Sequence, residues 1–425
     1  MKSFSPASGS QNPLASPVPA GSRYRYAKRR FRILFGLLDA LCGPAFRLGR
    51  AITPRRPAAD PRSILIVQLD HVGDAVLSTP MLRALRERFP EAAIDVVASQ
   101  CNNEIFETNP HVRRVHISKR NWLARGAGRQ RYFGEAFRLA RRMRRFRYDL
   151  GIDPRGDFLV ALVLSLAGIP RRLGWACGGG GFLLTDVARW DASRHEVESR
   201  RALLETVGVR TASTQPELGP SWADNYHVRE LLAAVPDFRL PLTVVHVGAG
   251  TPAKRWPVNH MARLVQRLAQ VFGGSVILVG DSGDQPLGRK LARSCAQTID
   301  WTGRLTLMQL AALLSEANLF IGGDSGPGHI SAALGTPSVM LFSGTNRDEC
   351  WRPIGPEVHV LRRAVICSPC HLKACPIAGH PCMSEISPAE VVEVARQIIR
   401  GSISRHDGSA PVGTIEFDAD LDKSA

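Results

Sequence analysis

The stretch from Phe320 to Thr345 reads FIGGDSGPGHISAALGTPSVMLFSGT, and it decides the fold. It predicts a strand, a glycine-rich irregular turn over 322–328, a short helix over 329–334 and a second strand over 339–342. In a parallel sheet, ligands bind at the turn that follows the carboxyl end of a strand. The free N–H groups of such a turn, and the N-terminus of the next helix, suit a phosphate or diphosphate. The alternative is an ordinary turn whose glycines only make it tight.

Two earlier segments repeat this strand–turn–helix pattern. The apolar run 63–69 is typical of a strand buried in a parallel sheet. The turn 70–74 and a helix over 75–89 follow it, and Pro80 is expected to break or bend the first turns of that helix. Later in the chain, the strand 242–247 leads into the turn 248–257, which reads GAGTPAKRWP. The repeat predicts an α/β protein with two Rossmann-like halves. A single nucleotide-binding domain with an appended helical domain is the alternative.

The length of 425 residues is sufficient for two domains of ordinary size. Composition and pattern predict four regions: a disordered or basic amphipathic extension (1–62), an N-terminal Rossmann-like domain (63–235, with a linker from about 209), a C-terminal Rossmann-like domain (236–403) and a disordered tail (404–425).

The net charge of +17 is concentrated in two segments. Residues 1–62 hold twelve Lys or Arg against two acidic residues, and residues 113–147 hold thirteen against one. Such patches favour anionic lipid headgroups or a phosphorylated substrate as partners, although solvated helix faces are the simpler alternative. Nucleic acid is not expected as a partner, because the chain lacks an aromatic-interleaved platform, a helix-turn-helix pattern and zinc-finger spacing.

Residues 24–48 combine a basic stretch with a short apolar one. Asp39, Pro44 and Arg47 interrupt the apolar run, so it is too short to span a bilayer. The pattern predicts an amphipathic helix on the inner face of the cytoplasmic membrane, and therefore a cytoplasmic, peripheral protein. A helix packed on the protein's own body is the alternative.

Four of the nine cysteines cluster near the C-terminus, at Cys367, Cys370, Cys375 and Cys382. Their density resembles a metal site, but their spacing is not that of a paired zinc ribbon. Reduced structural thiols, a structural zinc site and disulfides all remain open.

Four blocks, taken in order, resemble a known family: Ile64–Arg86, Val244–Pro257, Ile321–Thr345 and Cys367–Met383. The chain is similar to the ADP-heptose:lipopolysaccharide heptosyltransferases, glycosyltransferase family 9. This resemblance implies a GT-B fold, in which two Rossmann-like domains face each other across a cleft. It also implies an inverting reaction without metal or cofactor, and an acceptor site in the N-terminal half.

Sugar transfer from a nucleotide diphosphate requires a base that takes the proton of the acceptor hydroxyl. Asp74 matches the family's proposed base position, although a carboxylate there could instead cap a helix. Asp70 departs from the small hydroxyl residue of many relatives, and it either tunes Asp74 or competes with it. The residues expected at the acceptor are Asp70, His71, Arg155 and Asp157.

The reaction also requires positive groups that stabilise the charge growing on the leaving diphosphate. Lys254 matches the basic residue of the family's Lys-x-Trp-Pro block, with an ordinary surface lysine as the alternative. His329 either donates to a phosphate or caps a helix. The residues expected at the donor are Thr251, Asp284, Asp324, Ser325, Gly326, Gly328 and His329.

Together these features predict an inverting glycosyltransferase that moves a heptose or related sugar from a nucleotide-diphosphate donor, ADP-heptose being the family's usual one. The expected acceptor is lipopolysaccharide or another phosphorylated, lipid-linked glycan, and the basic run 113–147 is expected to bind its phosphates. A catalytically inactive GT-B-like binding protein of cell-envelope glycan assembly is the alternative.

Overall fold

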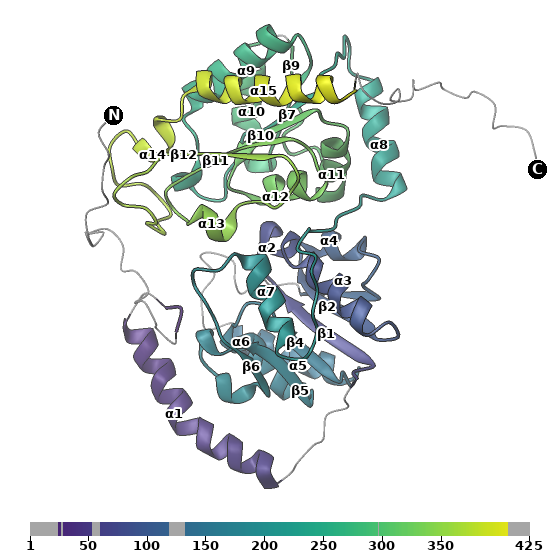
Figure 1. Cartoon of the computed structure of the whole chain (residues 1–425), viewed down its shortest axis with the longest axis vertical. Coiled ribbons are helices and arrows are strands. Elements are labelled where there is room, and N and C mark those ends of the chain that lie inside the picture. The colour runs from purple at the N-terminus through teal and green to yellow at the C-terminus, as the bar shows by residue number, and fades with distance from the viewer. Residues whose placement is uncertain (1–23, 27–28, 53–59, 119–131, 296, 407–425) are drawn as a thin grey trace, which may run out of the picture.

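The computed structural model describes residues 24–26, 29–52, 60–118, 132–295 and 297–406. Within them the chain forms two parallel sheets of six strands each, the first in order β3-β2-β1-β4-β5-β6 and the second in order β12-β11-β10-β7-β8-β9. Figure 1 shows the two sheets as separate bodies, one above the other, with helices around each. The predicted α/β architecture with two Rossmann-like halves is confirmed.

The first sheet is buried on both faces, which is why its strands are continuously apolar. Ile64 and Ile66 of β1 face one side, and Leu65 and Val67 face the other. The strands of this sheet are β1 (Ser63–Gln68), β2 (Ala93–Ser99), β3 (Arg114–Ser118), β4 (Leu150–Asp153), β5 (Arg171–Trp175) and β6 (Asp186–Ala188).

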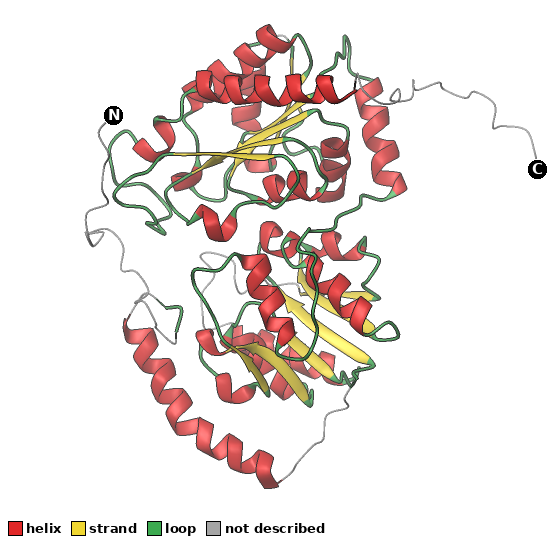
Figure 2. Ribbon diagram, viewed as in Figure 1, coloured by secondary structure: helices red, strands yellow, loops and turns green. Residues whose placement is uncertain are grey.

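Helices cover both faces of this sheet (Figure 2). Those of the N-terminal half are α2 (Val72–Val76), α3 (Thr79–Arg88), α4 (Asn103–Glu107), α5 (Tyr132–Arg144), α6 (Phe158–Leu166) and α7 (Glu196–Glu205). Buried side chains of α3 and α7 pack on the side of Ile64, whereas those of α5 and α6 pack on the side of Leu65. Helix α8 (Trp222–Ala233) then leads into the second sheet.

The second sheet repeats the arrangement. Its strands are β7 (Thr243–His246), β8 (Val276–Val279), β9 (Thr298–Asp300), β10 (Leu319–Gly323), β11 (Ser338–Phe342) and β12 (Val358–Arg362). Its helices are α9 (Val258–Phe272), α10 (Gln285–Ala292), α11 (Leu307–Ser315), α12 (Gly326–Ala333), α13 (Asp348–Trp351), α14 (Pro381–Ser384) and α15 (Pro388–His406). Apolar side chains of α9 and α15 pack on one face, and those of α11 pack on the other.

The segment 322–328 is more regular than we expected. Gly322 and Gly323 continue β10 and pair with β11, and α12 already begins at Gly326. Pro327 fits there because proline is tolerated in the first turn of a helix. A Cβ added at Gly328 would lie 2.1 Å from Cε of Met340, so this glycine permits close packing of helix on strand.

The helix expected over 75–89 is in fact two helices, α2 and α3, because the chain breaks before Pro80, which lies in the first turn of α3. Asp74, which we expected in a turn, therefore lies within α2.

Helix α1 (Arg29–Ile52) runs along the outside of the N-terminal half (Figure 1). Phe35 contacts Phe158 with ring centroids 5.5 Å apart, and the buried Asp39 accepts a 2.8 Å hydrogen bond from the backbone N–H of Gly180. The hydroxyl of Tyr24 donates to the other oxygen of Asp39, also at 2.8 Å. Among the residues that the structure describes, we find no helix long and apolar enough to cross a membrane.

Replacing Asp39 with alanine should loosen α1 from the body. The change removes the acceptor of Gly180 and Tyr24, and an unsatisfied buried donor costs about 1–3 kcal/mol. We expect faster amide hydrogen exchange over residues 29–43 with unchanged exchange in the sheet, because such opening is local. Asp60→Ala, which breaks an exposed pair with Arg88, is the control. Equal exchange in both variants would contradict this anchoring role.

Candidate functional site

The two halves touch where β1 and β10 each lead into a helix. A Cβ added at Gly73 in α2 would lie 2.7 Å from the ring of His329 in α12, and one added at Gly326 would lie 2.7 Å from Cβ of Val72. The helices therefore meet with no room for larger side chains. This contact brings the predicted residues of the two halves to one boundary, and Figure 1 shows α2 directly against the second half at this point.

Asp74 lies beside that contact and is largely buried. One of its carboxylate oxygens is 3.7 Å from a guanidinium nitrogen of Arg155 and 3.7 Å from one of Arg200. Arg200, on α7, is itself buried and donates to the hydroxyl of Ser78 at 2.8 Å. Two arginines thus face the Asp74 carboxylate, and their positive charges compensate its negative charge inside the protein.

Asp70 belongs to the same cluster and is only 1% exposed. It lies 2.8 Å from Arg155 and accepts a 3.1 Å hydrogen bond from the amide of Gln68. Burial raises the pKa of Asp70, and the charge of Arg155 partly offsets that effect. Asp70 and Asp74 therefore share one arginine in different surroundings.

Arg155 is held by a tight turn after β4. The carboxylate of Asp153 accepts hydrogen bonds from the backbone N–H groups of Arg155 (3.1 Å), Gly156 (2.9 Å) and Asp157 (2.7 Å). Burial, and next the nearby Asp157, raise the pKa of Asp153 to about 7. The side chain of Asp157 caps α6, and His71 occupies the exposed N-cap position of α2.

Lys254 lies on the other side of the boundary. Its Nζ is 2.5 Å from a carboxylate oxygen of Asp324 and 3.3 Å from the Asp324 carbonyl oxygen. The side-chain amide of Asn346 donates to the same carboxylate at 3.1 Å. Asp324 therefore orients the lysine that the sequence suggested for the diphosphate.

Two buried histidines line the glycine-rich segment. The hydroxyl of Ser325 lies 3.3 Å from Nδ1 of His246, the last residue of β7. Burial lowers the pKa of both His246 and His329 to about 4, so both are neutral near pH 7. Nδ1 of His329 is buried without a hydrogen-bond partner, and its ring does not cap α12.

The other residues expected to bind the nucleotide-sugar donor lie in the neighbouring turns of the second half. The hydroxyl of Thr251 is buried without a partner. Asp284 lies 3.8 Å from Arg255 and accepts from the backbone N–H of Asp281 at 3.2 Å. Trp256 is in the core, and its indole N–H donates to the carbonyl of Ile386.

The segment that carries the cysteine cluster adjoins the turn of Lys254, because the backbone N–H of Ala253 donates to the carbonyl of Lys373 at 3.0 Å. Its cysteines form no disulfide with one another, namely Cys367, Cys370, Cys375 and Cys382. In the part of the chain that the structure describes, no three His, Cys, Asp or Glu side chains are grouped so as to hold a metal ion.

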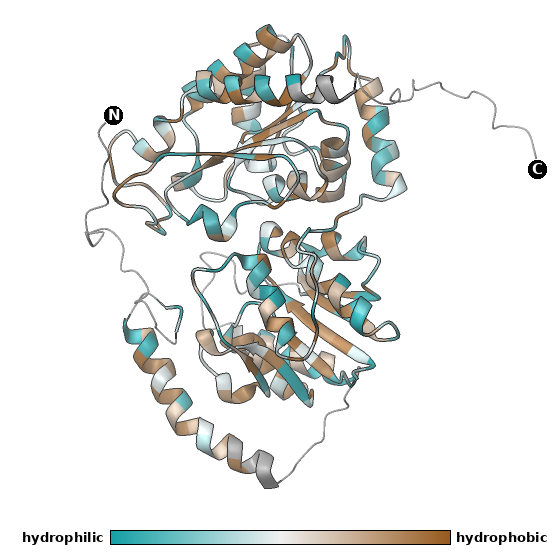
Figure 3. Cartoon of the chain, in the orientation of Figure 1, coloured by the Kyte–Doolittle hydropathy of each residue, from teal (hydrophilic) through white to brown (hydrophobic). Residues whose placement is uncertain are grey.

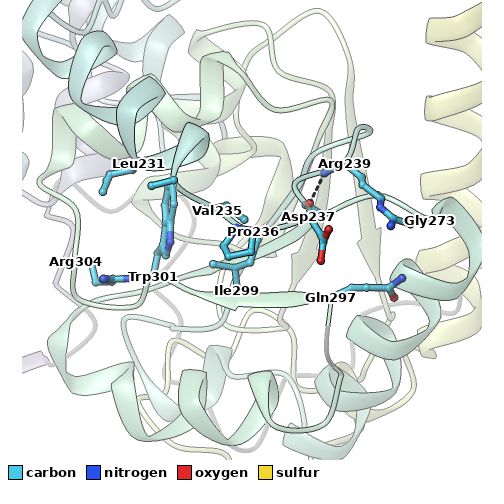
Figure 4. A pocket seen from close by; sticks show the side chains of 13 residues that line it. Leu231, Val235, Pro236, Asp237, Arg239, Gly273, Gln297, Ile299, Trp301 and Arg304 are labelled. Carbon is cyan, nitrogen blue, oxygen red and sulfur yellow. Dashed lines mark hydrogen bonds between the residues drawn. The ribbon is translucent and has the colours of Figure 1, made fainter.

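A cavity of about 610 Å³ lies between the end of α8 and β9. Trp301, Ile299 and Arg304 are among the residues that line it (Figure 4). It contains none of the predicted site residues.

The expectation that the basic run 113–147 binds the acceptor is wrong for its described C-terminal end. The carbonyl of Arg147 lies 3.4 Å from the hydroxyl of Ser63, the first residue of β1. This is the end of the sheet opposite to Asp74, so the arginines that end α5 lie away from the site. Residues 119–131 of the run lie outside the described residues.

The site residues that were not anticipated from the sequence include Gln68, Asp153, Arg200, His246 and Asn346. Gln68 lies inside an apolar strand, where a polar side chain is a usable signal, because a buried amide needs partners. Arg200 lies far along the chain from Asp74, and Asn346 lies 22 residues from Asp324, and no local pattern marks either residue.

Comparisons with known proteins agree with this geometry. Residues 136–380 match the model of glycosyltransferase family 9 (heptosyltransferase). The chain is 32% identical to lipopolysaccharide heptosyltransferase 2 of Salmonella typhimurium, over 70% of this chain and 87% of the relative. It is 27% identical to lipopolysaccharide heptosyltransferase 3 of Escherichia coli, over 66% and 82%.

A solved structure of E. coli ADP-heptose lipopolysaccharide heptosyltransferase II matches with a TM-score of 0.65 and 26% identity, over 80% of this chain and 99% of that one. The GT-B arrangement of the two halves is thereby confirmed. The chain belongs to glycosyltransferase family 9, the heptosyltransferase family, and is a glycosyltransferase.

Proposed function

We propose that the protein transfers heptose from ADP-heptose to the core of lipopolysaccharide, with inversion at the anomeric carbon. The observation that carries the proposal is the contact of Gly73 with His329, because it sets Asp74, one residue further on, beside the donor-side turns of the second half. Acceptor hydroxyl and sugar donor would meet at this boundary.

Asp74 acts as the general base. Its carboxylate takes the proton of the acceptor hydroxyl while the hydroxyl oxygen forms a bond to the anomeric carbon of the heptose. Arg155 and Arg200, each 3.7 Å away, fix the carboxylate in position. Asp70 holds Arg155 from the other side, and His71 and Asp157 border the acceptor.

The bond from the anomeric carbon to the diphosphate breaks on the opposite face, and its electron pair leaves with the diphosphate. Lys254, oriented by Asp324, stabilises the negative charge that develops there. The backbone N–H groups of Gly326 and Gly328, and the hydroxyls of Thr251 and Ser325, complete the donor site. His329 donates one neutral ring N–H to a phosphate oxygen, and Asp284 binds the ribose.

The inactive binding-protein alternative is not favoured. A binding module would not need a carboxylate, its two arginines and an oriented lysine at one boundary, because buried charges are costly to maintain.

Asp74→Asn should lower kcat at least about a hundredfold, because the amide cannot accept the proton. The dissociation constant for ADP-heptose, measured by calorimetry, should stay unchanged, since the lysine side of the site is intact. Asp191→Asn, at an exposed loop carboxylate, is the control and should retain full activity.

Asp70→Asn is the decisive companion variant. We expect a smaller loss than for Asp74→Asn, because Asp70 holds Arg155 rather than the reacting proton. If Asp70→Asn abolished transfer while Asp74→Asn retained it, the assignment of the base would be refuted.

We further propose that α1 rests on the cytoplasmic face of the inner membrane. Its outward side presents large apolar side chains, namely Ile33, Leu34, Leu37, Leu41 and Leu48, with Leu41 77% exposed. Arg29 and Arg30 flank them, and Figure 3 shows hydrophobic and hydrophilic bands along this helix. An apolar stripe beside basic residues suits an anionic lipid surface.

Helix α5 extends this surface. Its Phe133 and Phe137 are more than half exposed, and exposed arginines such as Arg138 lie beside them. Since α6 contacts both α1 and α5, the two helices lie on the same side of the first sheet. The arginines of α5, which do not reach the site, would then contact the phosphates of the lipid headgroups.

The double variant Leu37→Glu/Leu41→Glu should bind vesicles of phosphatidylglycerol and phosphatidylethanolamine at least about tenfold more weakly, because each buried leucine contributes about 1.5–3 kcal/mol. Flotation measures the bound fraction. Trp222→Glu, at a 78% exposed apolar residue on α8, is the matched control. Equal flotation of both variants would contradict the proposed membrane surface.

A further inference from the structure

The segment just before α1 lies against the turn that carries Arg155. A guanidinium nitrogen of Arg25 donates to the carbonyl oxygen of Arg155 at 2.7 Å, and another lies 3.7 Å from the carboxylate of Asp157. The Arg25 side chain is 23% exposed and spans 130 residues of sequence to make these contacts. A residue of the N-terminal extension therefore contacts the active-site turn directly.

A second loop fixes the same segment from the other side. The backbone N–H of Arg25 donates to the carbonyl of Cys177 at 2.9 Å, and the hydroxyl of Tyr26 donates to that of Gly178 at 2.9 Å. Gly178 in turn packs on the turn, because a Cβ added there would lie 2.0 Å from the carbonyl oxygen of Gly156. The segment, the loop and the turn form one closely packed unit.

Both backbone polar groups of Arg155 have partners. Its N–H donates to the carboxylate of Asp153, and its carbonyl accepts from Arg25. The Arg155 side chain leaves the same residue and reaches Asp70 at 2.8 Å and Asp74 at 3.7 Å. A small shift of the Arg155 backbone would therefore move its guanidinium away from Asp74.

We propose that Arg25 is a positioning residue that fixes the turn 153–157, and thereby Arg155 against Asp74. Tyr24, next to Arg25, donates a hydrogen bond to Asp39 of α1. This contact links α1, which we propose to rest on the membrane, to the turn 153–157 as one rigid element. The role of Arg25 in turnover rests on the proposed function. Its role in holding the turn does not.

The first test measures amide hydrogen exchange of Arg155, Gly156 and Asp157 in the full chain. Arg25→Ala should speed exchange at these amides by roughly tenfold, because the turn loses a donor and a charge that restrain local opening. Arg88→Ala, which removes an exposed ion pair in the same domain, should leave them unchanged. Unchanged exchange in Arg25→Ala would overturn the proposal, whether or not the protein transfers heptose.

The second test uses ADP-heptose and a deacylated core acceptor, so that membrane binding does not enter. Arg25→Ala should lower kcat roughly tenfold with KM for ADP-heptose within about twofold, because only the acceptor-side geometry is disturbed. Arg25→Lys, which can still donate to the Arg155 carbonyl, should recover part of the loss.

A double-mutant cycle separates positioning from general destabilisation. In an Arg155→Ala background, Arg25→Ala should change kcat by less than about twofold, because the group it positions is already absent. Multiplicative losses would overturn the positioning role. Absence of transfer by the wild-type chain would instead refute the proposed function and leave the exchange result to decide the role of Arg25 in the turn.

Discussion

The guanidinium of Arg155, set between Asp70 and Asp74, is the interaction on which the rest of the site depends. Two buried carboxylates at the end of one strand would be unstable without a cation, because removing charge from water is costly. Arg155 supplies it by direct contact with both carboxylates, and Arg200 lies 3.7 Å from Asp74 as a second cation. The turn after β4 and helix α7 must therefore converge on the end of β1, which fixes the geometry of the N-terminal half.

The second constraint is the close approach of the two halves. Gly73 packs against the ring of His329 and Gly326 packs against the side chain of Val72, so neither glycine position between α2 and α12 has room for a larger side chain. Other contacts support the same closed arrangement. The carboxylate of Glu104 accepts from the backbone N–H of Met308 at the start of α11, and His195 contacts the carbonyl of Arg352. The residues proposed to bind donor and acceptor lie on either side of this boundary because β1 and β10 both lead into helices there.

The sequence predicted the fold well wherever the pattern was local. Continuous apolar runs followed by glycine or acidic turns marked β1, β7 and β10, and these strands are where we expected them. Prediction was poorer where tertiary packing determines the local structure. Gly328 permits α12 to pack closely on Met340 of β11, and no composition rule distinguishes such a glycine from one in an irregular loop. The expectation that the arginines of α5 lie at the acceptor was wrong, because charge alone does not indicate at which end of a sheet the arginines of a helix lie.

The same distinction applies to the site. Asp74 and Lys254 were proposed from motifs, whereas the cation beside Asp74, Arg200, comes from a distant segment, and the contact of Asn346 with Asp324 emerges only in three dimensions. The most direct test of this account is to incubate the full chain with ADP-heptose and a deacylated lipopolysaccharide core. The mass and the anomeric configuration of the product are then measured. We predict an acceptor that has gained heptose with inverted configuration. An unchanged acceptor, or transfer with retained configuration, would contradict the central claim.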